Sequence, residues 1–521
     1  MEVKTVRAST NSCGWRHALV VGAGIGGLLA GRVLIEYFDR VTILERDASP
    51  YLSADRKGVP QGRHLHSLAT RGGEILERYF PNLDAELADA GCPALDQAWD
   101  TYTDTPAGRL PRFHSGITMR AVSRSLLEER VRNRLEAQPG VRFLAGREVV
   151  GLVPDDTGGA VAGVRTRRRG FKEAEEVLTA DLVVDASGQG SRAPRWLEEL
   201  AFDAPEEEVV DARLGYATRW FRVPEDFSDD WKGLAVLPGW PDDTRGGTLR
   251  QVEGDVWTVV LIGLGGDYPP TRGGAYLEFA RTLSSPAIYD AIKDAEPVSP
   301  VYGYRRTANR RRRYERTRLP ENLLVTGDAA CSLNPSYGSG MTAAALSAEA
   351  LERCLHEQCL RFSKHGLAGL GRRFHKRQAA AVAPCWKVTT STDQQWSASS
   401  VDELGLIGRL FYRVSEEVLV LAVEREDVAR TLLEVKNLLE PPSTLLRPGI
   451  LFPALWRAAL STFAKRDKPG SPTKPKKPPP KARYIQSTSG WVALSYGEAS
   501  PEQYGPFLDT FVRVIQLCSC H

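Results

Sequence analysis

The chain has 521 residues, enough to bury one large core or two to three smaller ones. Its 42% hydrophobic and 26% charged residues are ordinary for a soluble globular protein, and a net charge of +3 is too small to indicate nucleic acid or an anionic membrane as the partner. No apolar run reaches about 18 residues, so no transmembrane helix is expected. The N-terminal segment lacks the apolar core of a secretory signal, which favours a cytoplasmic location.

Cysteine usage indicates neither a metal site nor a disulfide framework. The eight cysteines are scattered along the chain. Only Cys518-Ser519-Cys520-His521 brings possible ligands together, and two thiols with one imidazole at a chain end are too few for a zinc site. We therefore expect reduced thiols and no metal.

A glycine-rich turn near the N-terminus is the strongest local signal. The apolar run Ala18 to Val21 predicts a buried strand, and Gly22, Gly24 and Gly27 follow in the spacing G-x-G-x-x-G, ahead of an apolar-periodic helix. The first glycine permits a tight turn, the second lets the backbone approach a pyrophosphate, and the third lets the helix pack closely on the strand. The helix N-terminus then offers N–H groups and a positive dipole end to phosphates.

A second strand completes this unit. The run Val41 to Leu44 ends in Glu45, about 20 residues after the glycines, where a carboxylate can accept hydrogen bonds from a ribose. Because strand, turn, helix and acid agree, the sequence predicts a dinucleotide site. The motif alone does not separate FAD from NAD.

The loop after Glu45 is rich in cations and imidazoles. It begins at Arg46, and its other polar candidates are Arg56, Lys57, Gln61, Arg63, His64 and His66. The loop is either a cover for the phosphates or the flavin, or a solvated loop whose histidines cap the next helix, and the sequence favours neither. Glu74 to Ala90 then predicts one amphipathic helix.

The chain next returns to the first domain through a meander. Residues from Ile117 begin extended and become helical at Ser123 or Ser125, where a serine can serve as N-cap. A strand and a small meander are expected at Val141 to Leu144, Glu148 to Val153, Ala160 to Arg168 and Glu176 to Leu178. The run Leu182 to Val184 then ends in the turn DASGQGSR, which indicates that the first domain resumes.

An aromatic-rich segment follows. Strands with tryptophans from Ala212 to Gly263 predict an antiparallel sheet, whose aromatics suit an apolar pocket or equally a plain core. Gly263-Leu264-Gly265-Gly266 resembles a nucleotide turn, but Pro269 and Pro270 prevent the required helix, so we expect a loop. The basic run Arg305 to Arg318 predicts a solvated face.

The last strong pattern is a strand from Leu323 that ends in Gly327-Asp328. The segment NPSYGSGM and an alanine-rich helix to about Cys359 follow it. Residues 361–465 predict helices, and the apolar, basic stretch Leu445 to Lys465 is either a packed terminal helix, which we favour, or a peripheral membrane contact. Residues 466–483 predict a Pro/Lys-rich linker, and 484–521 indicate no function.

Three ordered segments match one family. GAGIGG with Glu45, DASGQGSR and GDAACSLNPSYGSGM resemble the group A FAD-dependent monooxygenases, the family of para-hydroxybenzoate hydroxylase, over roughly the first 360 residues. GVPQGRHLH, AVSR, NPSYGSGM and APCWKVTTSTDQQW look closer to the flavin epoxidases of polyether antibiotic pathways and, more distantly, to squalene epoxidase.

The resemblance implies a mixed α/β fold. A Rossmann-like FAD-binding domain is expected to interleave with an antiparallel-sheet substrate domain and to precede a C-terminal helical region. The expected FAD-binding parts are 15–95, 117–205 and 305–360; the substrate domain takes 96–116 and 206–304, and helices take 361–465.

It also implies FAD and a set of residues around it. Gly22, Gly24 and Gly27 would hold the pyrophosphate, Glu45 the ribose, Arg124 the linker and Asp328 the ribityl chain, with Pro335, Tyr337, Gly338 and Gly340 beside the ring. Arg46, Arg63 and Met341 complete the candidate cofactor residues. No side chain is assigned a certain catalytic role, because the cofactor carries the chemistry.

Three positions depart from the family pattern. Ser187-Gly188 replaces the usual Asp-Gly pair, Cys331 stands where many hydroxylases have His, and Met341 stands where many have Asn. Ser187 puts direct NADPH use in doubt. Electrons are therefore expected from NAD(P)H or from a partner flavin reductase, with O₂ as cosubstrate.

The implied reaction is oxygen transfer through a flavin C4a-hydroperoxide, which an electron-rich alkene attacks without a protein base. Residues 212–300 contain no His, which favours epoxidation of a lipophilic polyene (a polyketide or terpenoid) over phenol hydroxylation. The alternatives are an aromatic hydroxylase on the same scaffold and a C=C reductase of the geranylgeranyl reductase type. The sequence does not indicate an oligomeric state.

Overall fold

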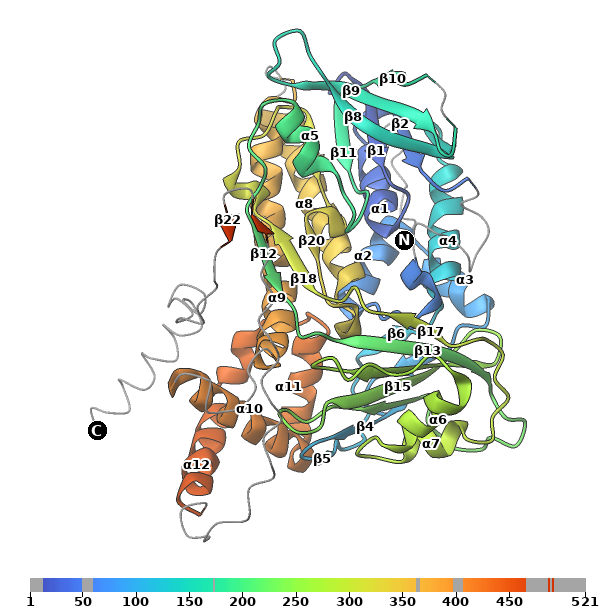
Figure 1. Cartoon of the computed structure of the whole chain (residues 1–521), viewed down its shortest axis with the longest axis vertical. Coiled ribbons are helices and arrows are strands. Elements are labelled where there is room, and N and C mark those ends of the chain that lie inside the picture. Colours follow the sequence, from blue (N-terminus) through green and yellow to red (C-terminus); the bar gives the residue numbers. More distant parts are fainter. Residues whose placement is uncertain are drawn as a thin grey trace, which may run out of the picture. The chain divides into compact units, whose positions relative to one another are not determined.

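The computed structural model describes residues 13–48, 60–171, 174–361, 366–396, 406–464, 486–487 and 490–491. The described residues up to 396 and Ala422–Pro442 form one compact unit, and those within Ser400–Leu421 and from Ser443 onward form a second (Figure 1). The expected linker 466–483 lies outside the described residues, and so does most of 484–521.

A five-stranded parallel sheet forms the centre of the first unit, in the order β19-β11-β1-β2-β7. Its strands are β1 Trp15–Val21, β2 Phe38–Glu45, β7 Val141–Ala145, β11 Leu182–Asp185 and β19 Leu323–Val325. The strands are apolar runs because both faces of the sheet are covered. Strands as far apart in sequence as β1 and β19 thus share one sheet, which confirms the expected mixed α/β fold with a Rossmann-like domain.

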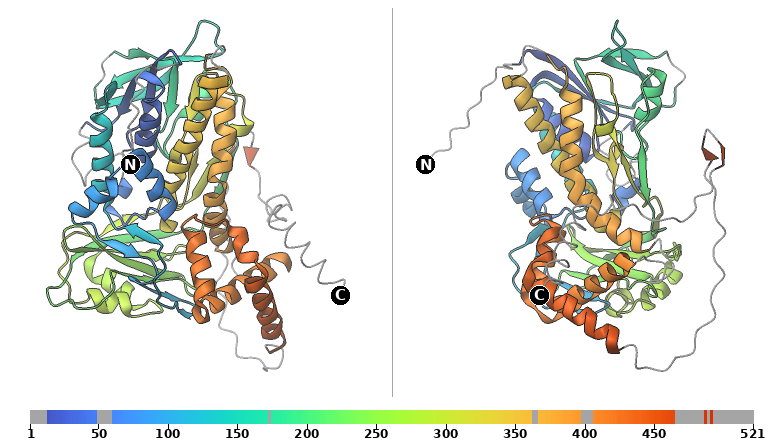
Figure 2. Two further views of the ribbon diagram at one scale, coloured as in Figure 1. Left: turned by 180° about the vertical axis from the view of Figure 1, so that it is seen from behind. Right: turned by 90° about the vertical axis from the view of Figure 1, so that its left-hand side faces the viewer.

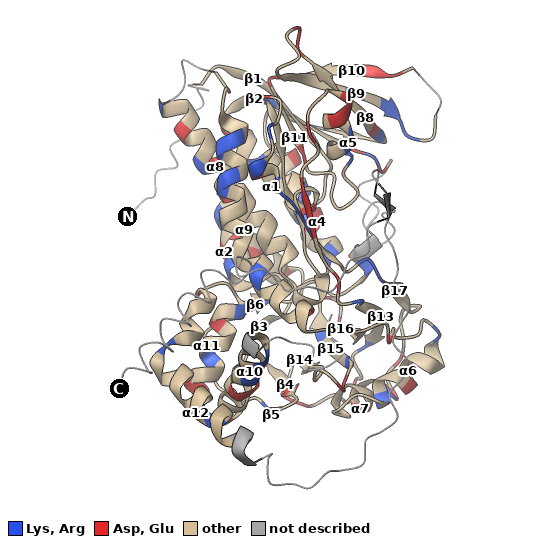
Figure 3. Ribbon diagram, turned by 60° about the vertical axis from the view of Figure 1, so that its left-hand side comes forward, with Lys and Arg blue, Asp and Glu red and all other residues tan. Residues whose placement is uncertain are grey.

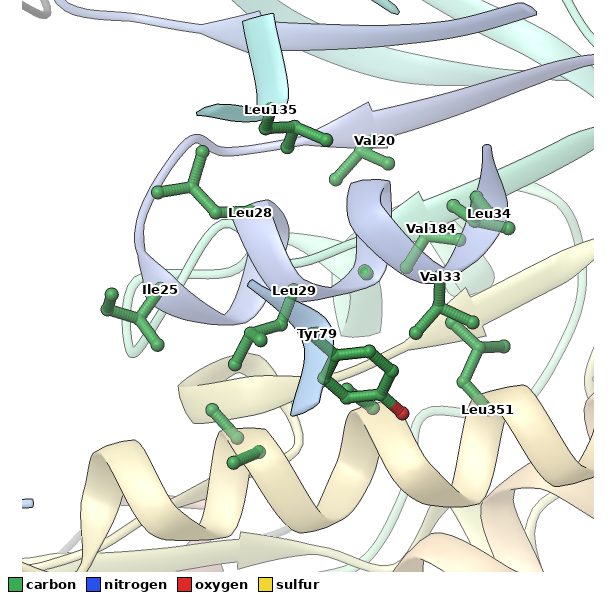
Figure 4. Packing of buried hydrophobic residues seen from close by; sticks show 14 of the residues in the cluster. Val20, Ile25, Leu28, Leu29, Val33, Leu34, Tyr79, Leu135, Val184 and Leu351 are labelled. Carbon is green, nitrogen blue, oxygen red and sulfur yellow. The ribbon is translucent and has the colours of Figure 1, made fainter. Parts of the chain in front are cut away.

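Helices cover this sheet. The first is α1 Ile25–Leu34, and the others are α4 Arg124–Glu136, α5 Ala193–Glu199, α8 Gly340–Arg361 and α9 Leu370–Gln395. Leu28, Leu29 and Val33 of α1 lie between the sheet and α8 (Figure 4). The helices α8 and α9 run side by side (Figure 2). Ser123 caps α4 by accepting from the Leu126 N–H at 3.3 Å, as the sequence predicts.

The expected single helix over Glu74 to Ala90 is wrong. Two helices, α2 Thr70–Tyr79 and α3 Leu83–Asp89, replace it. Pro81 has no N–H to continue the first helix, and Asn82 takes a left-handed backbone with φ of +67°. The chain therefore turns between the two helices.

The expected meander is confirmed. Strands β8 Arg147–Pro154, β9 Val161–Arg168 and β10 Glu176–Thr179 pair antiparallel. A short sheet of β3 Ala94–Asp96 and β6 Thr118–Arg120 lies between α3 and α4 in sequence. The segment 486–491 contains the paired strands β21 Gln486–Ser487 and β22 Gly490–Trp491.

A seven-stranded sheet follows the order β17-β13-β16-β15-β14-β4-β5. Its strands are β4 Thr101–Thr105, β5 Gly108–Arg109, β13 Gly215–Arg222, β14 Gly233–Val236, β15 Arg245–Val252, β16 Val256–Gly263 and β17 Tyr302–Tyr304. Neighbouring strands of this sheet pair antiparallel, except β14 and β4, which pair parallel. Helices α6 Gly273–Arg281 and α7 Ala287–Ile292 pack on one face around Trp257 (Figure 1). Gly265 and Gly266 follow β16 in a loop, as predicted.

The basic run is not simply a solvated face. Strands β12 Glu207–Val210, β18 Asn309–Arg312 and β20 Cys331–Ser332 form a three-stranded sheet. Arg312 is buried there, binds Glu207 at 2.8 Å and donates to the Ala329 carbonyl at 2.8 Å. The prediction fails at this position because a cross-strand carboxylate neutralises the cation. Elsewhere, basic and acidic residues are interspersed along helices and strands (Figure 3), in keeping with the small net charge.

One disulfide contradicts the expected reduced thiols. Cys13 and Cys359 are bonded, with their Cα atoms 5.3 Å apart. The free described cysteines Cys92, Cys331, Cys354 and Cys385 are buried. Among the described residues, no three His, Cys, Asp or Glu side chains are grouped as a metal site.

The C-terminal helices are confirmed. They are α10 Leu406–Glu424, α11 Glu426–Lys436 and α12 Pro448–Ala464. Within the described part of the chain, no helix has the length and apolar character needed to cross a membrane. On α12, Phe452, Trp456 and Leu460 are exposed.

The contact between α1 and the first glycine of the turn gives a stability prediction. A Cβ on Gly27 would lie 1.9 Å from the Gly22 carbonyl oxygen, a backbone atom that cannot rotate away. Gly27→Ala should therefore push α1 off β1 and lower the melting temperature markedly in thermal unfolding. Gly274→Ala in helix α6, where a Cβ meets no atom within 4 Å and φ is not positive, is the matched control for a glycine replacement. Equal melting temperatures for Gly27→Ala and the unchanged protein would contradict this packing.

Candidate active site

The three glycine-containing motifs meet at one edge of the parallel sheet. Val21 pairs with Asp185, and Asp185 pairs with Val325, so β1, β11 and β19 end side by side. A Cβ on Gly22 would lie 2.6 Å from the Ala186 oxygen, and one on Gly26 would lie 3.5 Å from the Gly327 Cα. The carboxyl edge of a parallel sheet is where such folds bind ligands, so this edge is the candidate site.

The first turn fits a pyrophosphate. Gly22 has φ of +102°, a conformation that favours glycine. Gly24 is the N-cap of α1 without any side-chain cap, and a Cβ there would meet no atom within 4 Å. The first turn of α1 contains no acidic residue. The turn therefore has free space beside Gly24, and the first turn of α1 itself adds no negative charge there.

Glu45 is oriented by backbone amides at the end of β2. Its Oε2 accepts from the Ala23 N–H at 3.1 Å and its Oε1 from the Asp47 N–H at 3.0 Å. The side chain is buried beside the glycine turn. Each carboxylate oxygen has a second lone pair, so Glu45 can still accept from a ribose hydroxyl. The neighbouring Arg46 is exposed.

Asp185 fixes the middle turn, and sequence reasoning missed it. It is fully buried, accepts from the Ser187 N–H at 2.9 Å and accepts from the Ser191 hydroxyl. Burial raises the pKa of this carboxyl above its usual value, opposed by those hydrogen bonds. The sequence did contain a signal for this role, because Asp185 ends an apolar strand directly before a turn rich in Gly and Ser.

Asp328 sits in the short 3₁₀ turn Gly327–Ala329 that follows β19. Burial raises its pKa, and the positive charge of Arg124 opposes this. Arg124, the first residue of α4, pairs with Glu128 at 2.6 Å. No described residue donates a hydrogen bond to Asp328, so its oxygens are available to the hydroxyls of a ribityl chain. The residues present therefore fit FAD.

The loop after β20 is shaped by local capping. Asn334 accepts from the Ser336 N–H at 3.1 Å and caps the 3₁₀ turn Pro335–Tyr337, which Pro335 begins and Gly338 ends at φ of +68°. A Cβ on Gly338 would lie 2.7 Å from the Ser67 Cβ, so glycine is needed there for close approach as well as for backbone conformation. Gly340 begins α8, and Met341 packs into the main core.

Asp393 of α9 holds this loop from behind, and sequence reasoning did not identify its role. It is fully buried and accepts from the Tyr337 hydroxyl at 2.7 Å, the Asn334 amide at 2.9 Å and the Asn309 amide at 2.6 Å. The Tyr337 hydroxyl thus points to α9. Nearby, His375 of α9 accepts from the Val325 N–H at 3.1 Å, and burial lowers its pKa to about 4. A neutral imidazole therefore fixes the end of β19.

Residues 63–67 lie against the seven-stranded sheet. The Arg63 carbonyl accepts from the Trp220 indole at 3.0 Å, and its guanidinium lies 5.0 Å from the Tyr302 ring centroid. His64 is buried and is hydrogen-bonded to Thr218 at 2.7 Å. Burial lowers the His64 pKa to about 4. The solvated-loop alternative is therefore wrong for His64, while Arg56 and Lys57 lie outside the described residues.

His64 also changes the argument about a missing base. It lies edge-on to Tyr216, with ring centroids 4.7 Å apart, and Tyr216 stacks on Tyr304 at 5.2 Å. An imidazole therefore reaches the sheet although residues 212–300 contain none. Next to it, burial lowers the His66 pKa to about 3, with Arg124 contributing, so this part of the chain also approaches the entrance of α4.

Removing the Asp393 carboxylate should destabilise the loop that follows β20. Asp393→Ala removes the acceptor of the buried Asn309 and Asn334 amides and of the half-buried Tyr337 hydroxyl, at a cost of about 3 kcal/mol or more. We expect a lower melting temperature, measured by thermal unfolding, together with less FAD per protein, measured by absorbance. Asp393→Asn keeps one acceptor oxygen and should show a smaller loss of both. Unchanged FAD content in Asp393→Ala would contradict a positioning role.

Comparison with known proteins agrees with this geometry. Residues 16–360 match the family described as FAD binding domain. The chain is 30% identical to Protein Rv3254 of Mycobacterium tuberculosis over 407 residues, which cover 74% of this chain and 82% of that protein. It is 24% identical to kynurenine 3-monooxygenase of Salinispora tropica over 363 residues, covering 65% of this chain and 72% of the relative.

A solved structure shares the fold. The flavoprotein/dehydrogenase of Cytophaga hutchinsonii superposes with a TM-score of 0.61 at 15% identity, covering 86% of this chain and all of that one. The family match extends over all three motif segments that meet at the sheet edge. The chain belongs to the FAD-binding domain family and is an enzyme of the FAD-dependent monooxygenases.

Proposed function

We propose that this enzyme epoxidises C=C bonds of a lipophilic polyene, of the polyketide or terpenoid class. The supporting observation is an apolar, aromatic cluster on the sheet face opposite α6 and α7. It consists of Ala212, Leu214, Tyr216, Val260, Ile262, Leu264, Tyr304 and Trp396. His64 lies edge-on to Tyr216 of this cluster, and three residues further on Ser67 meets Gly338, so the cluster lies near the candidate flavin site.

In this proposal the residues at the sheet edge bind FAD. Gly22, Gly24 and Gly27 hold the pyrophosphate, Glu45 the ribose and Asp328 the ribityl chain. Arg46, Arg63, Arg124, Pro335, Tyr337, Gly338, Gly340 and Met341 line the rest of the cofactor. When reduced, bound FAD supplies the activation of O₂. The protein orients the alkene and excludes water through the apolar cluster.

The electron source remains a separate part of the proposal. Ser187 stands in the middle turn, where the family usually has Asp, and its N–H serves Asp185 instead of a ligand. We propose that electrons come from NAD(P)H or from a partner flavin reductase. Measuring flavin reduction anaerobically with NADPH alone, and then with an added reductase, separates the two.

A second candidate is an aromatic hydroxylase, favoured by His64. Its imidazole is held neutral by burial and bonded to Thr218 beside two tyrosines. A neutral imidazole can accept a proton from a phenol, which an alkene epoxidase does not require.

The assignment of Asp328 gives a direct test. Asp328→Ala removes an acceptor that has no partner among the described residues, so the protein should fold but carry little FAD. Flavin absorbance per protein should fall at least several-fold while far-ultraviolet circular dichroism stays unchanged. Asp328→Asn, which keeps one acceptor oxygen, should bind FAD at an intermediate level. A normally yellow Asp328→Ala protein would overturn the assignment.

The reaction is tested with ¹⁸O₂. A conjugated or skipped polyene and a simple phenol are each supplied to the reduced enzyme, and products are analysed by mass spectrometry. We expect one ¹⁸O per oxidised double bond of the polyene. Oxygen incorporation into the phenol only, abolished in His64→Phe, would favour the second candidate. Saturation of a double bond without ¹⁸O would indicate a reductase.

A further inference from the structure

A glutamate of the seven-stranded sheet reaches the start of α4. Glu253 lies in the turn between β15 and β16, and its Oε2 accepts from the Ser123 N–H at 3.0 Å. The same oxygen accepts from the Cys92 thiol at 3.7 Å. Burial, with the charge of Glu253 adding to it, raises the Cys92 pKa to about 12, so the thiol stays protonated and donates. Glu253 thus binds two segments that lie 130 and 161 residues earlier in the chain.

The contact completes a helix cap that α4 does not provide for itself. Ser123 is the N-cap, and its hydroxyl accepts from the N–H of Leu126, the third residue of the helix. In a capping box, a Glu or Gln at that third position accepts in return from the N-cap N–H. α4 has Leu126 there, and Glu253 supplies the missing acceptor from another part of the chain. Since Ser123 is buried, loss of this acceptor would leave its N–H with little access to water.

α4 holds two arginines at the candidate FAD site. Arg124 is its first residue and pairs with Glu128 of the same helix at 2.6 Å, so the guanidinium follows the position of the helix end. Its charge opposes the effect of burial on the pKa of Asp328. Arg132, two turns further on, donates to the Ala23 carbonyl inside the glycine turn at 3.1 Å. Arg132 therefore fixes the middle of α4, while the place of Arg124 depends on the capped end.

We propose that Glu253 is a positioning residue for FAD: by capping α4 from the seven-stranded sheet, it holds Arg124 in place to bind the cofactor. Without the cap, the first turn of α4 would fray, and Arg124 belongs to that turn. A carboxylate acceptor makes the bond to the Ser123 N–H stronger than a neutral one and suits the positive end of the helix. This inference rests on the proposed placement of FAD beside Arg124 and does not depend on the substrate.

The test measures FAD binding to variants of the full chain. The dissociation constant for FAD is obtained by diluting the holoenzyme and following the rise in flavin fluorescence. Glu253→Ala should raise this constant about tenfold, the order expected for a lost helix cap. Glu253→Gln keeps an acceptor oxygen for the Ser123 N–H, so it should bind FAD within about twofold of the unchanged enzyme.

A double-mutant cycle tests whether Glu253 acts through Arg124. Arg124→Gln alone should weaken FAD binding, and Glu253→Ala added to it should have little further effect, because the guanidinium that Glu253 positions is gone. Each single replacement should also flatten the salt dependence of FAD binding, since the guanidinium acts through its charge. If the fold-changes of the two replacements multiply, Glu253 acts independently of Arg124, and the positioning role is overturned.

Asp255→Asn is the matched control. Asp255 lies in the same turn, is exposed and has φ of +51°, a conformation that Asn tolerates. Its replacement removes a negative charge from the turn without altering the cap of α4, so FAD binding should not change.

Unchanged FAD binding in Glu253→Ala would overturn the inference. If Glu253→Ala does not fold, Glu253→Asp replaces it: this variant keeps the charge but is one methylene shorter, and it should weaken FAD binding several-fold. Unchanged binding in Glu253→Asp would then overturn the inference. Unchanged binding in Arg124→Gln would overturn the placement of FAD beside Arg124 and this inference with it, whereas the proposed epoxidation is decided separately by product analysis.

Discussion

The close approach of α1 to the sheet edge is the constraint on which the other features depend. Gly27 lets α1 begin directly over the carbonyl of Gly22, and Gly22 in turn lies against Ala186 of the middle turn. Gly26 brings the same helix to Gly327 of the third motif. These are backbone contacts, so no rotamer change can relieve the clash that an added side chain would make. The parallel register of β1, β11 and β19 then determines which side chains meet at the edge.

Buried polar groups keep the turns in place without help from a ligand. Asp185 closes the middle turn, His375 fixes the end of β19, and Asp393 holds the loop after β20. Each accepts hydrogen bonds from groups that would otherwise be buried without partners. A rigid frame of this kind suits cofactor chemistry, because the protein contributes orientation and exclusion of water. Asp328 differs from these three, since its carboxylate is not used by the described protein.

The sequence predicts the parts that depend on local patterns. Apolar runs, glycine spacing and the Ser123 cap identify the parallel strands, the first turn and α4, because neighbouring residues determine them. Pro81-Asn82 also carried a local signal for the break between α2 and α3, although amphipathic spacing outweighed it. Contacts between distant segments were not predictable: His64 meets Thr218 154 residues later, and Arg250 meets Ser67 183 residues earlier. A single sequence contains no periodicity that links such pairs.

The strand order also affects how the protein is made. β11 ends at Asp185, but its neighbour in the sheet, β19, begins only at Leu323. In the sequence, strands β13 to β17 of the seven-stranded sheet lie between the two. At roughly 5–20 residues per second, a ribosome needs roughly 7 to 27 seconds to synthesise that interval. During this time the apolar edge of β11 has no partner strand, and such edges invite aggregation. The sheet edge that forms the candidate site is thus completed late in synthesis. A nascent chain that stalls before β19 exposes the unpaired edge of β11, which can pair with another chain.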